Sequence, residues 1–268
     1  MRSSRFARAG DTLEKLVENS FKAIDEGAYD LKRSVGTHDT LSLRKAIFSC
    51  PHAPLITEVK FSSPSKGQIR NFGTPSEIAL AMTEAGAVAL SVLTQPYLFD
   101  GSVSNLYAVR KAVSVPLLMK DITVSDVQID AALKAGADCI LLIKAVFDRN
   151  LAESGIDRLY DYAKSRGLQV LVEAHTEQEY AETLAAGYEF VGINNRNLAD
   201  LKVDLANTER LIASRGKGKS VIISESGISK PEDIRYLRRA GADAFLVGTS
   251  IMETGDIGAK VAELYNAL

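Results

Sequence analysis

Charged and amide side chains occur where several short apolar runs of the sequence end. Glu58 and Lys60 are two residues apart in the first of these runs, so on an extended backbone both side chains point to the same face. The other runs end at Lys120-Asp121, Glu173, Asn194 and Glu225. A lysine held protonated beside carboxylates is a candidate general acid, and a carboxylate in the same cluster is a candidate general base.

Each of these charges alone is consistent with a strand-end side chain that reaches water. The complete set favours a functional site, because a charge at the end of a buried run is costly unless it is paired or used.

The helix-like and strand-like segments that must position these charged residues repeat along the sequence. Ala-Gly phrases end helix-like stretches at intervals of about 50 residues, which indicates a repeated structural unit. Their glycines are Gly86, Gly136, Gly187 and Gly241. A glycine just after a helix is the usual left-handed C-cap, and the apolar run after each phrase is predicted to be a strand.

Eight apolar runs rich in Val, Ile and Leu alternate with helical patterns, at residues 55–60, 87–93, 116–120, 137–143, 169–173, 189–194, 220–225 and 243–248. Strands that are apolar along their whole length are buried on both faces, as in parallel sheets covered by helices. Eight such units predict an α/β fold of the (β/α)8 TIM barrel type. In that fold the C-terminal ends of the strands meet at the active site, so the charged residues are predicted to converge there.

Glycines and hydroxyl residues follow three of the predicted strands. They are Ser63-Pro64-Ser65-Lys66-Gly67 after the first, Ser226-Gly227 after the seventh and Gly248-Thr249-Ser250 after the eighth. Glycine lets backbone N–H groups approach an anion closely, and the loops after strands seven and eight commonly bind phosphate in these barrels. The sequence therefore predicts a phosphorylated substrate.

Residues 1–53 precede the barrel, which takes up residues 54–268, and are expected to form an N-terminal helical extension of one structural domain. Apolar residues keep helical spacing over residues 11–26, at Leu13, Leu16, Val17, Phe21 and Ile24. A second helix is predicted over residues 41–48, with an N-cap hydroxyl from residues 37–40. Two placements are open: the helices plug one end of the barrel, or they cover the catalytic mouth and close on substrate.

Composition excludes several classes of protein. The chain has 268 residues, with 32 Lys and Arg against 34 Asp and Glu, and this near-neutral balance argues against a nucleic-acid-binding protein. No apolar run approaches the roughly 18 residues of a membrane-spanning helix, and the N-terminus lacks the apolar core of a secretory signal. Cys50 and Cys139 are too few for a disulfide framework and are expected to be buried thiols in a reducing cytoplasm.

Several of these segments together resemble a known enzyme family. The segment from Glu58 to Gly67 resembles the E-x-K-x-x-S-P-S-K-G motif of indole-3-glycerol phosphate synthases. Further matching motifs are Ser91-Val-Leu-Thr94, Phe99-Asp-Gly101-Ser102, Leu118-Met-Lys120-Asp121, Gly192-Ile-Asn194-Asn195-Arg196-Asn197-Leu198, Ser224-Glu225-Ser226-Gly227-Ile228 and Leu246-Val-Gly248-Thr249-Ser250. The match runs in order from about Leu55 to Met252, and the family also has extra helices before its barrel.

The resemblance implies the indole-forming step of tryptophan biosynthesis, in which an anilino-deoxyribulose phosphate with a ring carboxylate gives indole-3-glycerol phosphate, carbon dioxide and water. By residue match, Lys120 is the general acid, Glu173 is the general base, and Lys60 lies near the substrate carboxylate and supplies a proton during dehydration. Orienting roles fall to Glu58, Asn194 and Glu225.

The resemblance also assigns substrate contacts. Phe99 is expected to pack on the aromatic ring and Arg196 to hold the carboxylate. Phosphate contacts are expected from Ser63, Ser226, Gly227, Gly248 and Thr249. No metal, nucleotide or organic cofactor is implied, and the expected partner is a small phosphorylated molecule rather than nucleic acid or membrane. A complex with another tryptophan-pathway enzyme stays open, and we expect a monomer or weak oligomer.

The sequence departs from the family pattern at three positions. Ile122 replaces an aromatic or bulky residue, which puts the packing of the ring in doubt. Lys144 replaces an apolar residue and is expected to turn to solvent rather than to the mouth. Thr249 replaces the more usual serine and keeps the hydroxyl. Outside the motifs, the histidines lack metal-ligand spacing, and His175 is expected in a solvated loop.

Other functions compete with this assignment. A sugar-phosphate isomerase, or an aldolase with a Schiff base on Lys120, would share the fold. A glycosidase is disfavoured because the chain has no Trp to stack on sugars. A non-catalytic phosphate-binding barrel is disfavoured because Lys60, Lys120, Glu173 and Glu225 are all retained.

Overall fold

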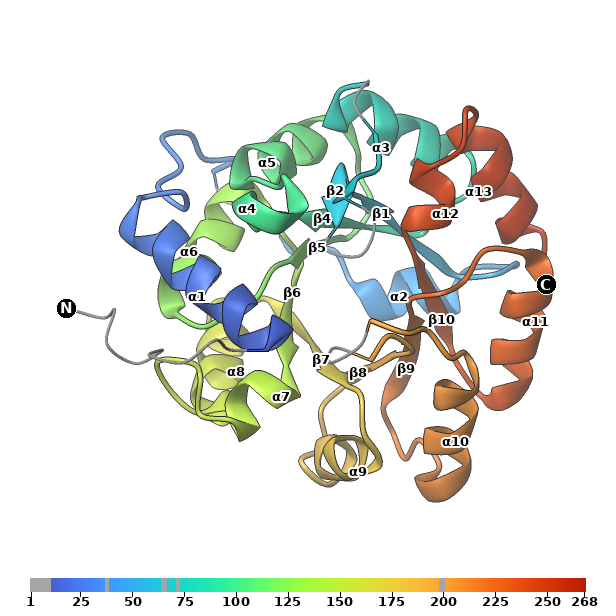
Figure 1. Ribbon diagram of the computed structural model, residues 1–268. Helices are drawn as coiled ribbons and strands as arrows, with labels where there is room; N and C mark the ends of the chain where they lie inside the picture. Colours follow the sequence, from blue (N-terminus) through green and yellow to red (C-terminus); the bar gives the residue numbers. More distant parts are fainter. Residues whose placement is uncertain (1–10, 37–38, 64–66, 71–72, 198–200) are drawn as a thin grey trace.

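The computed structural model describes residues 11–36, 39–63, 67–70, 73–197 and 201–268. Its centre is a closed barrel of parallel strands, surrounded by helices (Figure 1). The first strand pairs with both the second and the last barrel strand, which closes the sheet. The prediction of a TIM barrel is confirmed.

The eight barrel strands are β1 (Leu55–Val59), β4 (Ala89–Leu93), β5 (Leu117–Lys120), β6 (Cys139–Ile143), β7 (Gln169–Ala174), β8 (Phe190–Asn194), β9 (Val221–Glu225) and β10 (Ala244–Val247). Each coincides with one predicted apolar run. Almost every strand residue is buried, because the barrel interior covers one face and the helices cover the other. A short hairpin of β2 (Ser62–Ser63) and β3 (Gly67–Gln68) follows β1, and residues 64–66 of the predicted anion loop lie outside the described residues.

The outer helices are α3 (Pro75–Glu84), α5 (Val103–Ala112), α6 (Asp126–Ala135), α8 (Ile156–Ser165), α9 (Glu177–Ala185), α10 (Ala206–Arg215), α11 (Pro231–Ala240) and α13 (Ile257–Tyr265). Short helices α4 (Pro96–Phe99), α7 (Lys144–Asp148) and α12 (Thr249–Met252) lie in the loops after β4, β6 and β10. The four Ala-Gly glycines all have positive φ, from 74° to 111°, so the predicted left-handed helix ends are confirmed.

Two helices precede the barrel. Helix α1 (Thr12–Asp25) begins at the N-cap Asp11, as its apolar spacing predicts. Helix α2 (Leu43–Phe48) begins two residues later than predicted, and its N-cap is Ser42, whose hydroxyl accepts a hydrogen bond from the Lys45 N–H at 3.1 Å. The N-cap prediction at residues 37–40 is therefore wrong, although residues 37–38 lie outside the described part.

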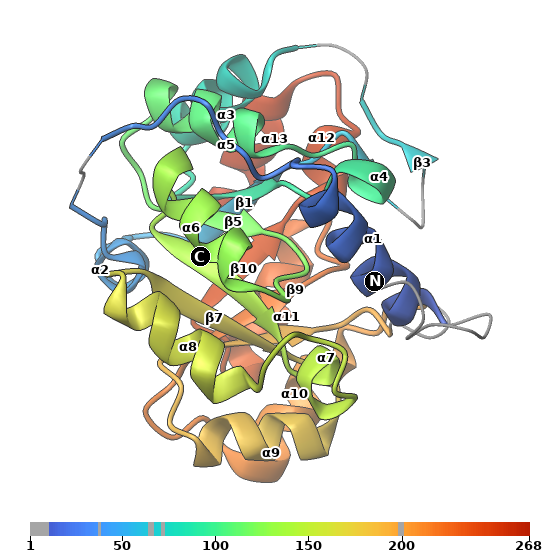
Figure 2. The same cartoon turned by 90° about the vertical axis from the view of Figure 1, so that its left-hand side faces the viewer.

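The two helices lie at opposite ends of the barrel (Figure 2). Helix α2 lies at the N-terminal ends of the strands, where the Leu43 N–H donates to the Gln169 side chain at the start of β7. Helix α1 lies at the other end, where Thr12 and Leu16 line a cavity. Helix α2 therefore lies at one end of the barrel and α1 at the mouth, and closure of α1 on substrate stays a prediction.

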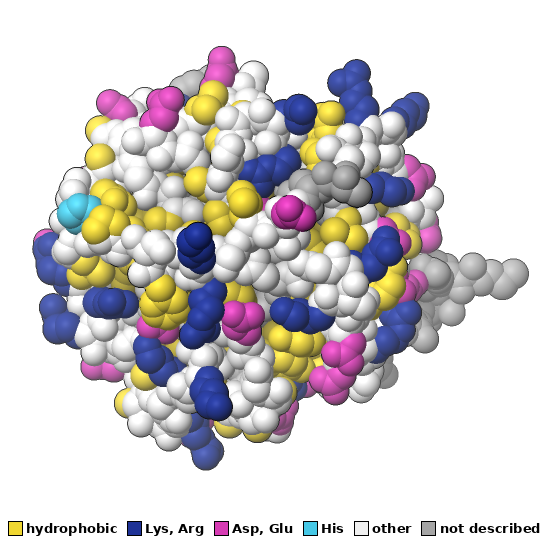
Figure 3. Space-filling model, turned by 180° about the vertical axis from the view of Figure 1, so that it is seen from behind, with side chains coloured by type: hydrophobic (Ala, Val, Ile, Leu, Met, Phe, Trp, Pro, Cys, Tyr) yellow, Lys and Arg dark blue, Asp and Glu magenta, His cyan; other side chains and the backbone are white. Residues whose placement is uncertain are grey.

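The outer surface carries no large region of one charge on the face opposite to that of Figure 1. Basic and acidic side chains alternate there with apolar ones (Figure 3). None of the helices in the described part of the chain is long and apolar enough to cross a bilayer.

Candidate active site

A cavity of about 400 Å³ opens at the C-terminal ends of the barrel strands. It is the place where the active sites of this fold are found. The structure brings every site residue named from the sequence to the wall of this cavity: Glu58, Lys60, Ser63, Phe99, Lys120, Glu173, Asn194, Arg196, Glu225, Ser226, Gly227, Gly248 and Thr249. Ile122 also lines it, so the residue that departs from the family pattern does face the site.

Lys120 lies between two carboxylates at the centre of the cavity. Its Nζ donates to Oε2 of Glu173 at 2.8 Å and to Oε2 of Glu225 at 2.6 Å. Lys120 and Glu225 end β5 and β9, and Glu173 is the last residue but one of β7, so alternate strands of the barrel supply them. Because both carboxylates are buried and the Lys120 side chain is largely buried, their charges interact strongly.

These contacts set the protonation states of the free enzyme. Burial alone would lower the pKa of Lys120, but the carboxylates of Glu173, Glu225 and Glu58 outweigh burial and raise it above its ordinary value. Burial opposes ionisation of Glu173 too, yet the Lys120 ammonium and His175 hold its pKa well below the usual range. Burial raises the pKa of Glu225 to about 7, and the Glu173 charge adds to that rise. Lys120 is therefore protonated, Glu173 ionised and Glu225 close to its titration point at neutral pH.

A second ion pair lies on β1. Nζ of Lys60 is 2.8 Å from Oε1 of Glu58, and the Ser91 hydroxyl of the neighbouring strand donates to the other carboxylate oxygen at 3.4 Å. As the spacing of two residues predicts, both side chains face the cavity. The mouth thus holds three Lys–Glu ion pairs, two made by Lys120 and one made by Lys60.

Two glycines make room for the buried carboxylates. A Cβ atom on Gly192 would lie 2.1 Å from Oε1 of Glu225, and one on Gly248 would lie 2.6 Å from Oε1 of Glu58. Such distances are far below van der Waals contact, so any side chain at these positions would displace the carboxylates. Gly248 was expected only to approach phosphate, and the spatial need for Gly192 was missed. Strand pairing of Gly192 with Glu173 explains its place in the charged layer.

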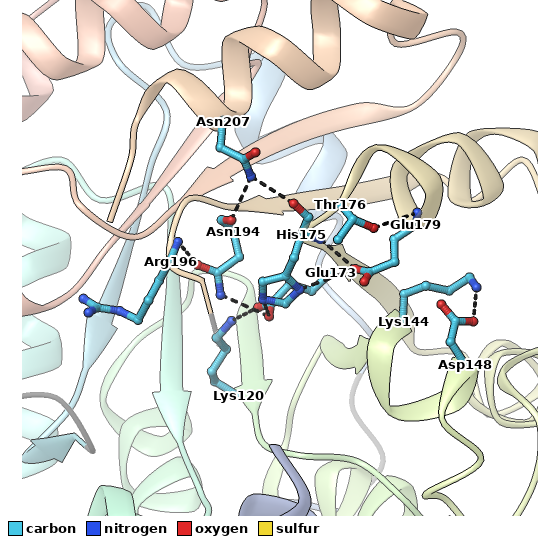
Figure 4. A network of polar contacts seen from close by, with 10 residues as sticks. All are labelled: Lys120, Lys144, Asp148, Glu173, His175, Thr176, Glu179, Asn194, Arg196 and Asn207. Carbon is cyan, nitrogen blue, oxygen red and sulfur yellow. Dashed lines mark hydrogen bonds and ion pairs between the residues drawn. The ribbon is translucent and has the colours of Figure 1, made fainter. Parts of the chain in front are cut away.

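The amide side chain of Asn194 fixes the second oxygen of Glu173. Nδ2 of Asn194 donates to Oε1 of Glu173 at 3.1 Å, while Oδ1 of Asn194 accepts from the Arg196 backbone N–H at 2.9 Å (Figure 4). The Arg196 guanidinium points away from Glu173 and donates to the Leu201 carbonyl at 2.9 Å. Glu173 is therefore held on both oxygens before substrate arrives.

The loops after β9 and β10 form the opposite wall of the cavity. Ser226 has a φ of 68° and Gly227 a φ of 87°, so two successive residues adopt the left-handed region. A non-glycine residue in that region is uncommon and marks a constrained loop. The Ser250 hydroxyl donates to the Ile228 carbonyl at 2.8 Å, which ties the two loops together.

Two expectations about polar residues near the mouth are wrong. Lys144 does not turn to solvent: its side chain is buried, and its ammonium pairs with Asp148 and Glu182. It is not among the residues that line the cavity. His175 is not a solvated loop residue either, because its ring is buried with Nε2 3.3 Å from Oε1 of Glu173. The separation of two residues from Glu173 was the available signal, since it places both on one face as in Glu58 and Lys60.

A buried polar network around Asp121 was also missed. The Tyr29 hydroxyl donates to Asp121 at 3.0 Å, and Asp121 accepts further bonds from the Thr94 hydroxyl, the Ile122 N–H and the Gln128 amide. Burial raises the pKa of Asp121 to about 6 despite these donors. Because Asp121 follows Lys120 directly, the network ties the segment after α1 to the strand that carries Lys120.

Comparison with known proteins identifies the family. The model of the family "Indole-3-glycerol phosphate synthase" matches residues 13–264. The chain belongs to this family. An indole-3-glycerol phosphate synthase of Methanocaldococcus jannaschii is 42% identical over 252 residues, covering 92% of this chain and 90% of the relative. One of Bacillus cereus is 39% identical over 249 residues, covering 92% and 95%. Family membership supports a carboxy-lyase of tryptophan biosynthesis.

Solved structures of lower sequence similarity share the fold alone. A thiamine phosphate pyrophosphorylase from Pyrococcus furiosus has a TM-score of 0.60 at 16% identity, covering 84% of this chain and 97% of its own. An N-acetylmannosamine-6-phosphate 2-epimerase from Clostridium perfringens has a TM-score of 0.59 at 17% identity, covering 80% and 93%.

Proposed function

We propose that the chain converts 1-(2-carboxyphenylamino)-1-deoxyribulose 5-phosphate into indole-3-glycerol phosphate, carbon dioxide and water, with Lys120 as general acid and Glu173 as general base. The observation that carries this proposal is the position of Lys120 Nζ between the carboxylates of Glu173 and Glu225. An ammonium group fixed in this way is protonated when substrate binds and is aimed into the cavity.

Ring closure is the first step. The ring carbon that bears the carboxylate attacks the ketone carbon, and the ketone oxygen takes a proton from Lys120 to become a hydroxyl. Negative charge develops on that oxygen in the transition state, so a buried cation beside it lowers the barrier. Loss of carbon dioxide then returns the bonding electrons to the ring and restores its aromaticity.

Dehydration completes the indole. The new hydroxyl leaves as water with a proton from Lys60, and Glu173 takes a proton from the neighbouring methylene carbon. The two lysines donate two protons and Glu173 accepts one, so the reaction consumes one proton. This balance is required because an anionic carboxylate leaves as neutral carbon dioxide. The distance of 2.8 Å between Glu173 and Lys120 supports direct return of the proton to the lysine.

Substrate contacts follow from the residues around the charged centre. Phe99, at the end of α4, offers an apolar wall for the aromatic ring, and Arg196 and Lys60 offer positive charge for the carboxylate. The Ser226-Gly227 and Gly248-Thr249 segments line the cavity after β9 and β10, and the loops after the seventh and eighth strands commonly bind phosphate in this fold, which supports a phosphate contact here. Oε1 of Glu225 has no hydrogen-bond partner among the described residues, which suits a contact with a substrate hydroxyl.

A Schiff-base mechanism on Lys120 fits the site poorly. An amine must lose its proton before it can attack a carbonyl, and the surrounding carboxylates raise the pKa of Lys120. We also propose a cytoplasmic location, since both cysteines are free thiols. Cys139 is buried as expected, whereas the expectation of a buried thiol is wrong for Cys50, which is only partly buried.

The test is indole fluorescence after the purified chain is mixed with the carboxyphenylamino substrate. The chain has no Trp, so the product signal rises on a low background. We expect Lys120→Met and Glu173→Gln each to lower kcat by about 100-fold or more, with unchanged circular dichroism. A flat trace from folded wild-type protein, or covalent trapping of substrate on Lys120 by borohydride, would refute the proposal.

A further inference from the structure

The imidazole of His175 contacts the oxygen of Glu173 that Lys120 does not. Nε2 of His175 is 3.3 Å from Oε1 of Glu173, and Nδ1 is 3.5 Å from Oε2 of Glu179 (Figure 4). The ring is buried, and neither His175 nor Glu179 is among the residues that line the cavity. A chain of alternating charges therefore runs from Glu179 through His175 and Glu173 to Lys120.

Glu179 owes its position to the start of α9. Its backbone N–H donates to the Thr176 hydroxyl at 3.2 Å, and its carboxylate accepts from the His175 backbone N–H at 2.8 Å. The Asn207 amide donates to the His175 carbonyl at 3.1 Å and so fixes the same turn from α10. The backbone N–H of His175 thus fixes the Glu179 carboxylate beside the His175 ring.

The arrangement favours the imidazolium form of His175, since only the protonated ring carries a positive charge between the two carboxylates. Burial would lower the pKa of His175, but Glu173 and Glu179 outweigh it and raise the pKa to about 9. Other charged groups nearby are Lys120 on β5, Glu225 on β9 and Lys144 on α7. The ammonium of Lys144 is paired with the carboxylates of Asp148 and Glu182.

We propose that His175 is a positioning residue that keeps Glu173 ionised and oriented toward Lys120, and that Glu179 acts on Glu173 through it. The inference rests on the proposed function, in which Glu173 is the general base. When substrate draws the Lys120 ammonium away from Glu173, the imidazolium remains as a cation on the other carboxylate oxygen. The Glu173 carboxylate then stays ionised and keeps its orientation during the step in which it accepts a proton.

The first test is the pH profile of kcat/KM. Removing a cation within about 4 Å raises the pKa of a carboxylate, so His175→Asn should move the acid limb upward by about one pH unit or more. Glu179→Gln should move the same limb in the same direction by less. Glu182→Gln removes a carboxylate one turn further along α9 that pairs with Lys144, and it should leave the limb in place. His52→Asn is the matched control for loss of a histidine.

The second test needs no activity. In the proton NMR spectrum of the full-length chain, the ring signal of His175 should titrate near pH 9. The signal is assigned by its loss in His175→Asn. If that variant does not fold, His175→Gln serves instead. Glu179→Gln should lower that midpoint. A His175 midpoint near the ordinary 6.5, or an acid limb unmoved in His175→Asn, would overturn the inference. If the wild type is inactive but His175 titrates with a high midpoint, the proposed function is refuted while the protonated state of His175 is confirmed.

Discussion

Gly192 leaves the space that Oε1 of Glu225 occupies: a Cβ atom added to the glycine would lie 2.1 Å from that oxygen. The two residues belong to adjacent strands, β8 and β9, so neither can retreat without disturbing the barrel. The position of Lys120 between its two carboxylates therefore requires that residue 192 on β8 has no side chain.

We expect Gly192→Ala to displace the Glu225 carboxylate and to lower kcat/KM by about 10- to 100-fold, because small errors in the placement of catalytic groups are costly. Gly255→Ala is the matched control, since a Cβ there meets no atom within 4 Å. Steady-state kinetics on both variants, with thermal unfolding as a check, measure the effect. Equal activity of the two variants would show that the charged centre tolerates the shift.

Gly248→Ala should act on the other ion pair. Its Cβ would lie 2.6 Å from Oε1 of Glu58, so the Glu58–Lys60 pair must move. If Lys60 binds the substrate carboxylate and Gly248 approaches the phosphate, KM should rise more than kcat falls. Binding of an unreactive substrate analogue that keeps the ring carboxylate, with and without phosphate, measured by calorimetry, separates the two causes: loss of affinity for both analogues indicates the ion pair, and loss for the phosphorylated one alone indicates the phosphate contact.

The contact between Tyr29 and Asp121 predicts an effect on stability. Tyr29→Phe leaves a buried carboxylate with one donor fewer, which should lower the free energy of unfolding by about 1 to 3 kcal/mol. Urea unfolding against Tyr236→Phe, which removes an exposed hydroxyl bound to Glu209, isolates the burial effect. Similar losses in the two variants would mean that the Asp121 network adds nothing beyond a surface hydrogen bond.

Glu225 makes stability depend on pH. Its folded-state pKa of about 7 lies above the ordinary 4.5, so its protonated form favours the folded state. That contribution is complete below pH 4.5 and is lost as the pH rises through 7. We therefore expect Glu225→Gln, which cannot ionise, to gain in Tm relative to wild type between pH 5 and 8. Calorimetric scans across that range measure the difference, and parallel curves for the two proteins would contradict the raised pKa.

The strands and most site residues could be predicted from sequence because each carries a local signal. A buried parallel strand is a run of apolar residues, and a charge at the end of such a run is unusual. The ends of β5, β7 and β9 each showed this pattern, and the fold brings them to one place. Gly192 lacks such a signal, since its requirement arises from a side chain on the next strand.

The errors at Lys144 and His175 have a common physical cause. Each residue lies just beyond a strand end, where the apolar run that indicates burial has stopped. The partners that make burial tolerable lie on α9: Glu182 for Lys144 and Glu179 for His175. Pairing of that kind depends on how a helix packs against the end of its strand, which a single sequence does not display.

Helices α1 and α2 close opposite ends of the barrel, and one short stretch of chain joins them (Figure 2). Along its course the Val35 N–H donates to the Lys134 carbonyl and the Thr40 hydroxyl to the Gly167 carbonyl. The Tyr29 hydroxyl adds a buried bond to Asp121, and Leu41 bonds to Asp138 and Gln169. Because the described part of this stretch is held by separate hydrogen bonds rather than by a strand ladder, we expect it to belong to the part of the protein that opens first. Heating should therefore abolish turnover at a lower temperature than it melts the sheet, and inactivation would report the release of the N-terminal segment rather than the collapse of the barrel.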